Sequence, residues 1–153
     1  MSYHLLCYRL GDQVRLGIET AGAVYDLAEL LRDERYASFA VVLDNWPACS
    51  IRLAAASGQI AQGEHQGAAR PGVTLAAPYL AGQIYAGGGN YTDHLEAVMR
   101  MIGGDKPADP RANGGEPWFF VKPGRASVVG QGAEIPHPRF TKMLDYELEC
   151  GFR

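Results

Sequence analysis

Three carboxylates alternate in the segment "LDYELECGFR", residues 144–153. Side chains two residues apart in a β-strand point to the same face, so Asp145, Glu147 and Glu149 would share one face of a strand. A solvated strand edge is the common explanation of such spacing, although charged surfaces usually mix both signs. Because a hard divalent cation such as Mg²⁺ would remove the repulsion between the carboxylates, the pattern also fits a metal site. Both interpretations remain open from the spacing alone.

A glycine run, Gly87-Gly88-Gly89-Asn90, forms a second candidate site between an apolar strand and a helix. Glycines let the backbone approach a ligand, and the N-terminus of a helix favours anions. The run is followed by neither Gly-Lys-Ser nor Gly-Lys-Thr, and Thr92 interrupts a Gly-x-Gly-x-x-Gly pattern, which excludes both common nucleotide fingerprints. A tight strand-to-helix turn is the simpler explanation of the glycines.

His94 would be the first residue of the helix that follows this run. The positive end of the helix dipole favours the neutral imidazole, which can act as a base. An exposed surface histidine is the alternative. Asp93 and Glu96 have the spacing of a helix N-cap and its partner at the third helical position.

Hydrophobic spacing and turn residues predict the elements that position these side chains. Strands are expected at residues 5–10, 14–18, 23–25 and 84–86, and within 117–124, 126–135 and 143–152. The first expected helix runs from an N-cap at Asp26, with Glu29 at the third helical position, to Arg32. Two more helices are expected at 38–48, with a break at Pro47, and at 50–57, with a stop at Gly58. The last expected helix runs from an N-cap at Asp93 to Gly103-Gly104. Residues 58–72 are expected to form a surface loop, and residues 105–117 a loop long enough to be a lid.

The composition places the chain among ordinary soluble globular proteins. Its 153 residues suffice for one domain, or for a small domain and part of another, and its net charge is −3 without any basic run. A broad nucleic-acid-binding face is therefore excluded. No apolar stretch approaches the roughly 20 residues that span a bilayer, and no signal peptide is recognised at residues 1–10, so a cytoplasmic protein without a membrane partner is expected.

The three cysteines, Cys7, Cys49 and Cys150, are too widely spaced for a zinc site or a disulfide framework. We expect them to be single buried thiols in a reducing compartment.

Three segments in this order resemble the fumarylacetoacetate hydrolase family of metal-dependent 2-oxo-acid enzymes. They are "IYAGGGNYTDH" at 84–94, "PWFFVKPGRASVVGQGAEI" at 117–135 and "LDYELE" at 144–149. The opening part of the sequence resembles, more weakly, the small N-terminal domain of the family. The resemblance implies an α+β fold. A small N-terminal α/β domain (1–78) would precede the first part of a mostly β catalytic roll (79–153), which is incomplete in this chain.

The resemblance also assigns roles to individual residues. Glu147 and Glu149 match paired ligands of Mg²⁺ or Mn²⁺, and Asp93 matches a further ligand of some members, which competes with its capping role. His94 matches the catalytic histidine. The substrate contacts implied are at Tyr91, Lys122 and Arg125.

The activity implied is hydrolase or lyase cleavage of a C–C bond in 2-oxo (β-diketo) acids such as acylpyruvates or fumarylpyruvate, through an enolate that the metal stabilises. A hydratase, decarboxylase or isomerase of the same family is the alternative, as is a non-catalytic fragment that binds a 2-oxo acid or a partner. The full-length protein is expected to be a homodimer.

Two departures from the family pattern affect these expectations. Many members carry a glutamate three residues after the histidine, where this sequence has Ala97, and Glu96 comes one residue early. The third carboxylate ligand of the family, an Asp, is expected beyond residue 153. The site would be completed there, and the 153-residue chain alone is expected to be inactive.

Overall fold

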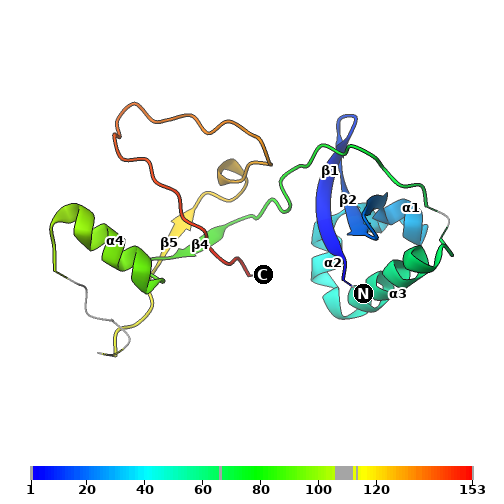
Figure 1. Ribbon diagram of the computed structural model, residues 1–153, viewed down its shortest axis with the longest axis horizontal. Helices are drawn as coiled ribbons and strands as arrows, with labels where there is room; N and C mark the ends of the chain where they lie inside the picture. The colour runs from blue at the N-terminus through cyan, green and yellow to red at the C-terminus, as the bar shows by residue number, and fades with distance from the viewer. Residues whose placement is uncertain (1, 66, 106–111, 113, 153) are drawn as a thin grey trace. The chain divides into compact units, whose positions relative to one another are not determined.

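The computed structural model describes residues 2–65, 67–105, 112 and 114–152. It divides the chain into two units, Met1–Tyr79 with Val129–Arg153, and Leu80–Val128. Helices and strands occur together, so the fold is a mixture of α and β elements (Figure 1). The expected catalytic roll and the domain boundaries at 78 and 79 remain predictions.

The first unit begins with an antiparallel sheet of three strands in the order β1-β2-β3. These strands are β1 His4–Leu10, β2 Gln13–Thr20 and β3 Ala23–Asp26. The turns between them contain Gly11 and Gly22, whose φ angles of 59° and 76° favour glycine. The predicted meander is therefore confirmed, with β2 extended by two residues to Thr20.

One face of this sheet carries the core. The register pairs Leu5 with Ile18 and Cys7 with Leu16, so these four side chains point the same way. Leu16 and Ile18 are completely buried. The core cluster continues into the helices and the segment beyond them, through residues Tyr25, Leu27, Ala28, Tyr36, Val42, Cys49, Leu53, Ile60 and Ala76.

Helix α1 (Leu27–Leu31) begins as predicted, because the Asp26 carboxylate accepts a hydrogen bond from the backbone N–H of Glu29. A 3-10 turn, η1 (Glu34–Ala37), follows it. The segment beyond the next helices lies along the edge of β1, where the Arg9 amide donates to the carbonyl of Thr74 at 2.9 Å.

The next two helices, α2 (Phe39–Asp44) and α3 (Trp46–Gln62), correct two expectations. The first helix ends before Asn45, and Pro47 lies in the first turn of α3, where its missing N–H costs nothing. Helix α3 also continues through Gly58 to Gln62 and ends at Gly63, with φ 73°. Burial of one face of α3 outweighs the roughly 1 kcal/mol that a helical glycine costs.

A buried polar cluster holds β1, β2 and β3 together on the other face of the sheet. The Asp26 carboxylate accepts hydrogen bonds from the Tyr8 hydroxyl and from Arg15, at 2.6 Å from Nε and 2.9 Å from the terminal nitrogen. Arg15 also pairs with Glu34 at 2.7 Å. Burial alone would raise the pKa of Asp26, but the hydrogen bonds from Arg15, Tyr8 and the Glu29 amide lower it to about 2.

The second unit contains a two-stranded antiparallel sheet and one longer helix. The strands are β4 (Ile84–Gly87) and β5 (Phe119–Lys122), and the helix is α4 (Thr92–Ile102), followed by a 3-10 turn, η3 (Arg125–Ser127). Helix α4 ends at Gly103, with φ 71°, as predicted. No hydrophobic side chain among the described residues 80–128 is buried.

Two predicted strands do not form. Residues 126–135 contain part of η3 and a turn, and residues 143–152 are irregular. A strand is stable only when a neighbour takes its backbone hydrogen bonds, and no described segment pairs with either stretch.

Candidate active site

The connection between β4 and α4 carries the first group of candidate residues. Tyr91 is the residue that caps α4, and its extended backbone (φ −105°, ψ 133°) precedes the helix. Asp93 lies within the first turn instead of capping it, and its Oδ1 accepts a hydrogen bond from the His94 amide at 2.9 Å. The predicted capping role of Asp93 is therefore wrong, although an acidic residue in the first turn still complements the helix dipole.

His94 is the third residue of α4 rather than the first, and its side chain is half-buried. Residue 97 lies on the same face of this helix one turn further on. It is Ala97, whereas Glu96 projects about 100° away around the helix axis. Helix α4 therefore places the Ala97 methyl group where many members of the family that this sequence resembles have a carboxylate.

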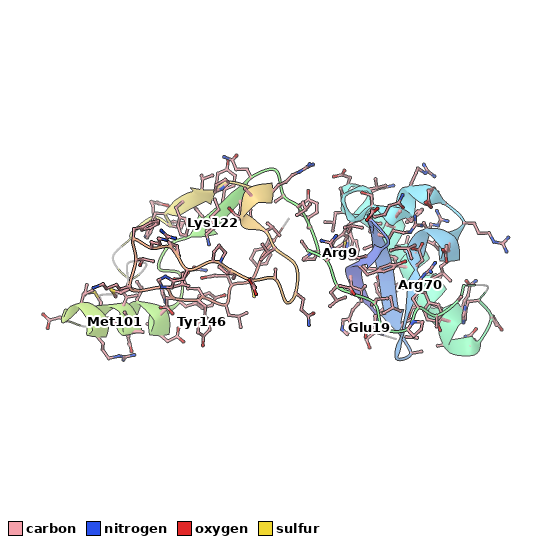
Figure 2. All side chains as sticks on the ribbon, turned by 90° about the horizontal axis from the view of Figure 1, so that it is seen from above. Arg9, Glu19, Arg70, Met101, Lys122 and Tyr146 are labelled. Atoms are coloured by element: carbon pink, nitrogen blue, oxygen red, sulfur yellow. The ribbon has the colours of Figure 1, made fainter. Side chains whose placement is uncertain are left out.

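Lys122 is the last residue of β5 and is paired with Ile84 at the beginning of β4. Its ammonium group lies 5.5 Å from the centroid of the Phe120 ring, a cation–π distance. The Trp118 ring lies 6.2 Å from the Phe120 ring, between centroids, at an interplanar angle of 40°. We call these three side chains the Trp118–Phe120–Lys122 row; Figure 2 labels its charged end, Lys122.

The glycine run packs against the other end of this row. The Gly88 amide donates a hydrogen bond to the Trp118 carbonyl at 3.0 Å, which continues the β4–β5 ladder by one residue. A Cβ atom on Gly88 would lie 2.1 Å from the Trp118 indole, and one on Gly89 would lie 2.9 Å from the Leu95 side chain. Close packing between the strand, the loop and α4 therefore requires glycine at Gly88 and Gly89.

Arg125 follows a second close backbone approach. A Cβ atom on the buried Gly124 would lie 2.0 Å from the carbonyl oxygen of Gly82. This contact brings the end of β5 beside the chain that enters β4. Arg125 is exposed and three residues from Lys122, so both cations lie near the same end of the sheet.

The segment with Asp145, Glu147 and Glu149 is exposed and forms no strand. The Asp145 carboxylate accepts a hydrogen bond from the Tyr146 amide at 2.8 Å, a local bond that competes with strand pairing. Tyr146 and Leu148 are more than 90 % exposed (Figure 2 labels Tyr146). The common strand face predicted for the three carboxylates is therefore not present. Cys150 is likewise exposed, contrary to expectation, while Cys7 and Cys49 are buried.

The donor atoms of Asp93, Glu147 and Glu149 are carboxylate oxygens, which suit Mg²⁺ or Mn²⁺. Within the ranges that the structure describes, however, no three His, Cys, Asp or Glu side chains gather as metal ligands. The chemistry of the donors fits the metal, and the ligand set remains a prediction. The predicted lid at 105–117 lies largely outside the described residues, which omit 106–111 and 113.

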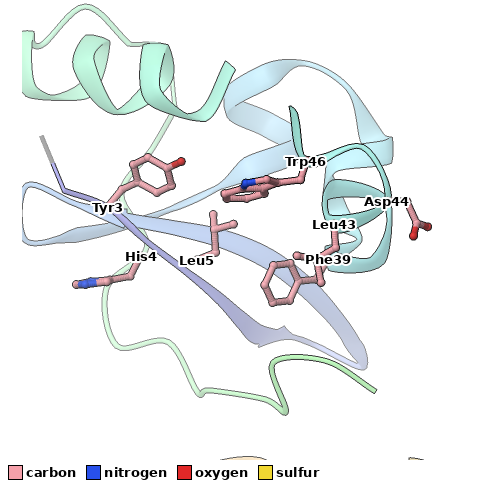
Figure 3. Close-up of a pocket in the computed structure, with 7 residues that line it drawn as sticks. All are labelled: Tyr3, His4, Leu5, Phe39, Leu43, Asp44 and Trp46. Carbon is pink, nitrogen blue, oxygen red and sulfur yellow. The ribbon is translucent and has the colours of Figure 1, made fainter. Parts of the chain in front are cut away.

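A cavity of about 760 Å³ in the first unit was not predicted. The rings of Tyr3, Phe39 and Trp46 lie around Leu5 there (Figure 3), and His4, Leu43 and Asp44 complete the lining. Aromatic residues spread over 44 positions carry no local spacing that could have revealed this cavity from the sequence. Among the described residues, no helix is both long and apolar enough to cross a membrane.

Comparison with known protein families gives a match over the second half of the sequence. The family described as fumarylacetoacetate (FAA) hydrolase, C-terminal, matches residues 83–153. No curated protein and no solved structure matches the chain. The matched range contains β4, α4 and β5 together with the glycine run, His94 and Lys122. Residues 83–153 therefore match the C-terminal domain of the fumarylacetoacetate hydrolase family, whose members are generally enzymes, and the match supports membership of this family.

Proposed function

We propose that this sequence belongs to a metal-dependent hydrolase or lyase that cleaves a C–C bond in 2-oxo (β-diketo) acids, such as acylpyruvates or fumarylpyruvate. The observation that carries the proposal is the family match over residues 83–153, which contains every predicted site residue. These residues are Tyr91, Asp93, His94, Lys122, Arg125, Glu147 and Glu149.

In this proposal His94 is the base. It lies in the first turn of α4, and the fixed helix backbone orients its side chain. Lys122 and Arg125 supply positive charge for the substrate carboxylate, and both are exposed to an incoming ligand. Tyr91, at the cap of α4, is a further substrate contact.

Glu147, Glu149 and Asp93 are the residues that would hold Mg²⁺ or Mn²⁺, together with the Asp expected beyond residue 153. When bound, such a cation stabilises negative charge that develops on the oxygen atoms of a 2-oxo acid. We also propose a homodimer in the full-length protein, which light scattering on the purified protein would test.

Magnesium titration tests the ligand assignment. The dissociation constant of Mg²⁺ is measured by calorimetry for the full-length wild-type protein and its Glu147→Ala and Glu149→Ala variants, with Glu134→Ala as an exposed control outside the ligand motif. Loss of either ligand should weaken binding on the order of tenfold or more, while the control remains unchanged. Equal affinity and equal turnover in all four proteins would remove the proposal.

Ala97 favours a second candidate. Because the position one turn beyond His94 carries a methyl group, the acid partner found in many members is missing from this helix face. The second candidate is therefore a non-catalytic protein that binds a 2-oxo acid or a partner. A hydratase, decarboxylase or isomerase of the same family is a separate alternative within the enzymes. Assays with acylpyruvates, oxaloacetate and dioates separate these cases, since binding without product supports the non-catalytic alternative.

A further inference from the structure

The Trp118–Phe120–Lys122 row faces small residues on the neighbouring strand. The register places Ala86 opposite Phe120 and Gly87 opposite Phe119, and the hydrogen bond from Gly88 places Trp118 next in the same ladder. The two large rings thus lie across from alanine and glycine. The indole packs directly on Gly88, where no side chain could fit.

The row also links the two ends of the site. Lys122 is paired with the beginning of β4, whereas Trp118 is paired beyond its end, where the chain turns into α4 and His94. Between them, the Lys122 ammonium leans over Phe120 at 5.5 Å, and the Trp118 ring lies 6.2 Å further on. A ligand whose carboxylate binds Lys122 and which extends towards α4 would pass over both rings.

We propose that Trp118 is a specificity-determining residue, whose indole forms the subsite for an apolar acyl group of a 2-oxo acid. This inference rests on the proposed function and adds the substrate class to it. Trp118 is 62 % exposed although its indole lies against Gly88, so apolar surface is available to a ligand. Burial of that surface by an aromatic or aliphatic group is favourable.

A substrate with a second carboxylate would bind over these rings less favourably than a substrate with an apolar acyl group. Lys122 is the single cation among the described residues on this sheet face, and it lies at one end of the row. The residues on this face are Ile84, Ala86, Gly88, Trp118, Phe120 and Lys122. A distal carboxylate that lies over the rings would face their electron-rich surfaces and lose water without gaining a cation on this sheet face. The row thus favours acylpyruvates with apolar acyl groups over dioates.

Three probes test this subsite. Pyruvate has no tail, phenylpyruvate has an aromatic tail, and 2-oxoglutarate has a second carboxylate and does not decarboxylate spontaneously. Their dissociation constants are measured by calorimetry in excess Mg²⁺ on the full-length wild-type protein, Trp118→Ala and Trp118→Phe. We expect the wild type to bind phenylpyruvate on the order of tenfold more tightly than pyruvate or 2-oxoglutarate. Trp118→Ala should abolish this preference without changing the affinity for pyruvate, and Trp118→Phe should retain most of it.

Gly88 provides an independent check. Gly88→Ala should displace the indole and reduce the preference for phenylpyruvate as Trp118→Ala does. In the double variant the two losses should not add, because they remove the same packed indole. Fully additive losses would contradict the subsite.

The outcomes separate this inference from the proposed function. If pyruvate binds and depends on Glu147 while Trp118→Ala leaves the preference unchanged, the proposed function stands and the subsite is overturned. An equal loss of affinity for all three probes in Trp118→Ala would assign the indole a structural role only, which also overturns the subsite. If the wild type binds none of the probes, the proposed function fails and the subsite fails with it.

Discussion

The sheet of β1, β2 and β3 and the sheet of β4 and β5 are both antiparallel, but their side chains differ in burial. Leu16 and Ile18 on β2 are completely buried, whereas Phe119 on β5 is 62 % and Tyr85 on β4 is 67 % exposed. The first sheet is covered by helices and the segment that follows them. The second sheet has no covering layer among the described residues of its unit.

This difference shows what stabilises each region. A two-stranded sheet is marginal by itself in water, and so is a single helix of about three turns. In residues 2–79, hydrophobic burial and the cluster around Asp26 stabilise the elements. In the described part of residues 80–128, backbone pairing and close contacts at Gly88 and Gly124 define the elements, and no hydrophobic side chain there is buried. The candidate site residues Tyr91 to Arg125 thus depend on the less stabilised region.

Hydrogen exchange should show the largest contrast between the two regions. Amides of β2 should exchange only when the first unit unfolds, and amides of β5 should exchange through local opening. With a stability of at least about 4 kcal/mol for the first unit, the protection factors should differ on the order of 10³. Comparable protection in β2 and β5, measured by NMR, would show that the second region is stabilised by more than the described contacts.

Asp26→Asn tests the buried cluster of the first unit. The substitution leaves the Arg15 guanidinium, whose side chain is 10 % exposed, without its main counter-charge. Removing one partner of such a pair should destabilise the unit by about 3–5 kcal/mol in urea unfolding followed by Trp46 fluorescence. The matched control is Glu34→Gln, since Glu34 faces the same guanidinium but its side chain is 76 % exposed, and this substitution should destabilise the unit far less than Asp26→Asn. Similar losses in both variants would contradict the role assigned to burial.

Leu53→Ala probes the apolar part of the same core. Leu53 is completely buried on α3, whereas Ile51 on the same helix is 73 % exposed. The first substitution should cost about 2–5 kcal/mol, and Ile51→Ala less than about 0.5 kcal/mol. In contrast, NMR spectra of β4 and β5 should be unchanged by Leu53→Ala if the two regions are stabilised separately.

The pH dependence of stability should give the smallest effects. Because the folded-state pKa of Asp26 is lowered from 3.8 to about 2, its contribution is present above pH 4 and is lost as the pH falls towards 2. Burial and the hydrogen bond to Asp26 raise the pKa of Tyr8 from 10 to about 12, so its contribution is present below pH 10 and is lost between pH 10 and 12.

Tyr8→Phe tests the predicted loss of stability between pH 10 and 12. The variant should lose about 1.5–3 kcal/mol at neutral pH, the typical contribution of a hydrogen bond to a charged group. Its stability should also change less than that of the wild type between pH 10 and 12. An unchanged alkaline slope would show that Tyr8 does not titrate in this window.

Much of the fold follows from local signals. Asp26 with Glu29 defines the start of α1, the glycines at 11 and 22 define the turns of the first sheet, and Gly103 ends α4. These features depend on backbone geometry and on bonds between near neighbours, so short patterns predict them. The family was predicted from three segments in the same way, and the match at residues 83–153 confirms it.

Other features depend on partners far away in the chain. Local spacing predicted that the helix ends at Gly58, but α3 continues to Gln62 because Ile60 is buried against the core. Asp26 was predicted as a cap alone, and only the folded sheet brings Tyr8 and Arg15 to its carboxylate. The alternation at Asp145, Glu147 and Glu149 predicted a strand, which does not form because alternation cannot supply a neighbouring strand.

The sequence by itself therefore determined the start of α1, the turns of the first sheet, the end of α4 and the family, because each is encoded by residues close together in the chain. The tertiary structure alone decided the extent of α3, the buried cluster around Asp26 and the packing of Trp118 on Gly88. These three features arise between residues that are distant in sequence and meet only when the strands pair. Pairing and burial select among the conformations that local patterns permit.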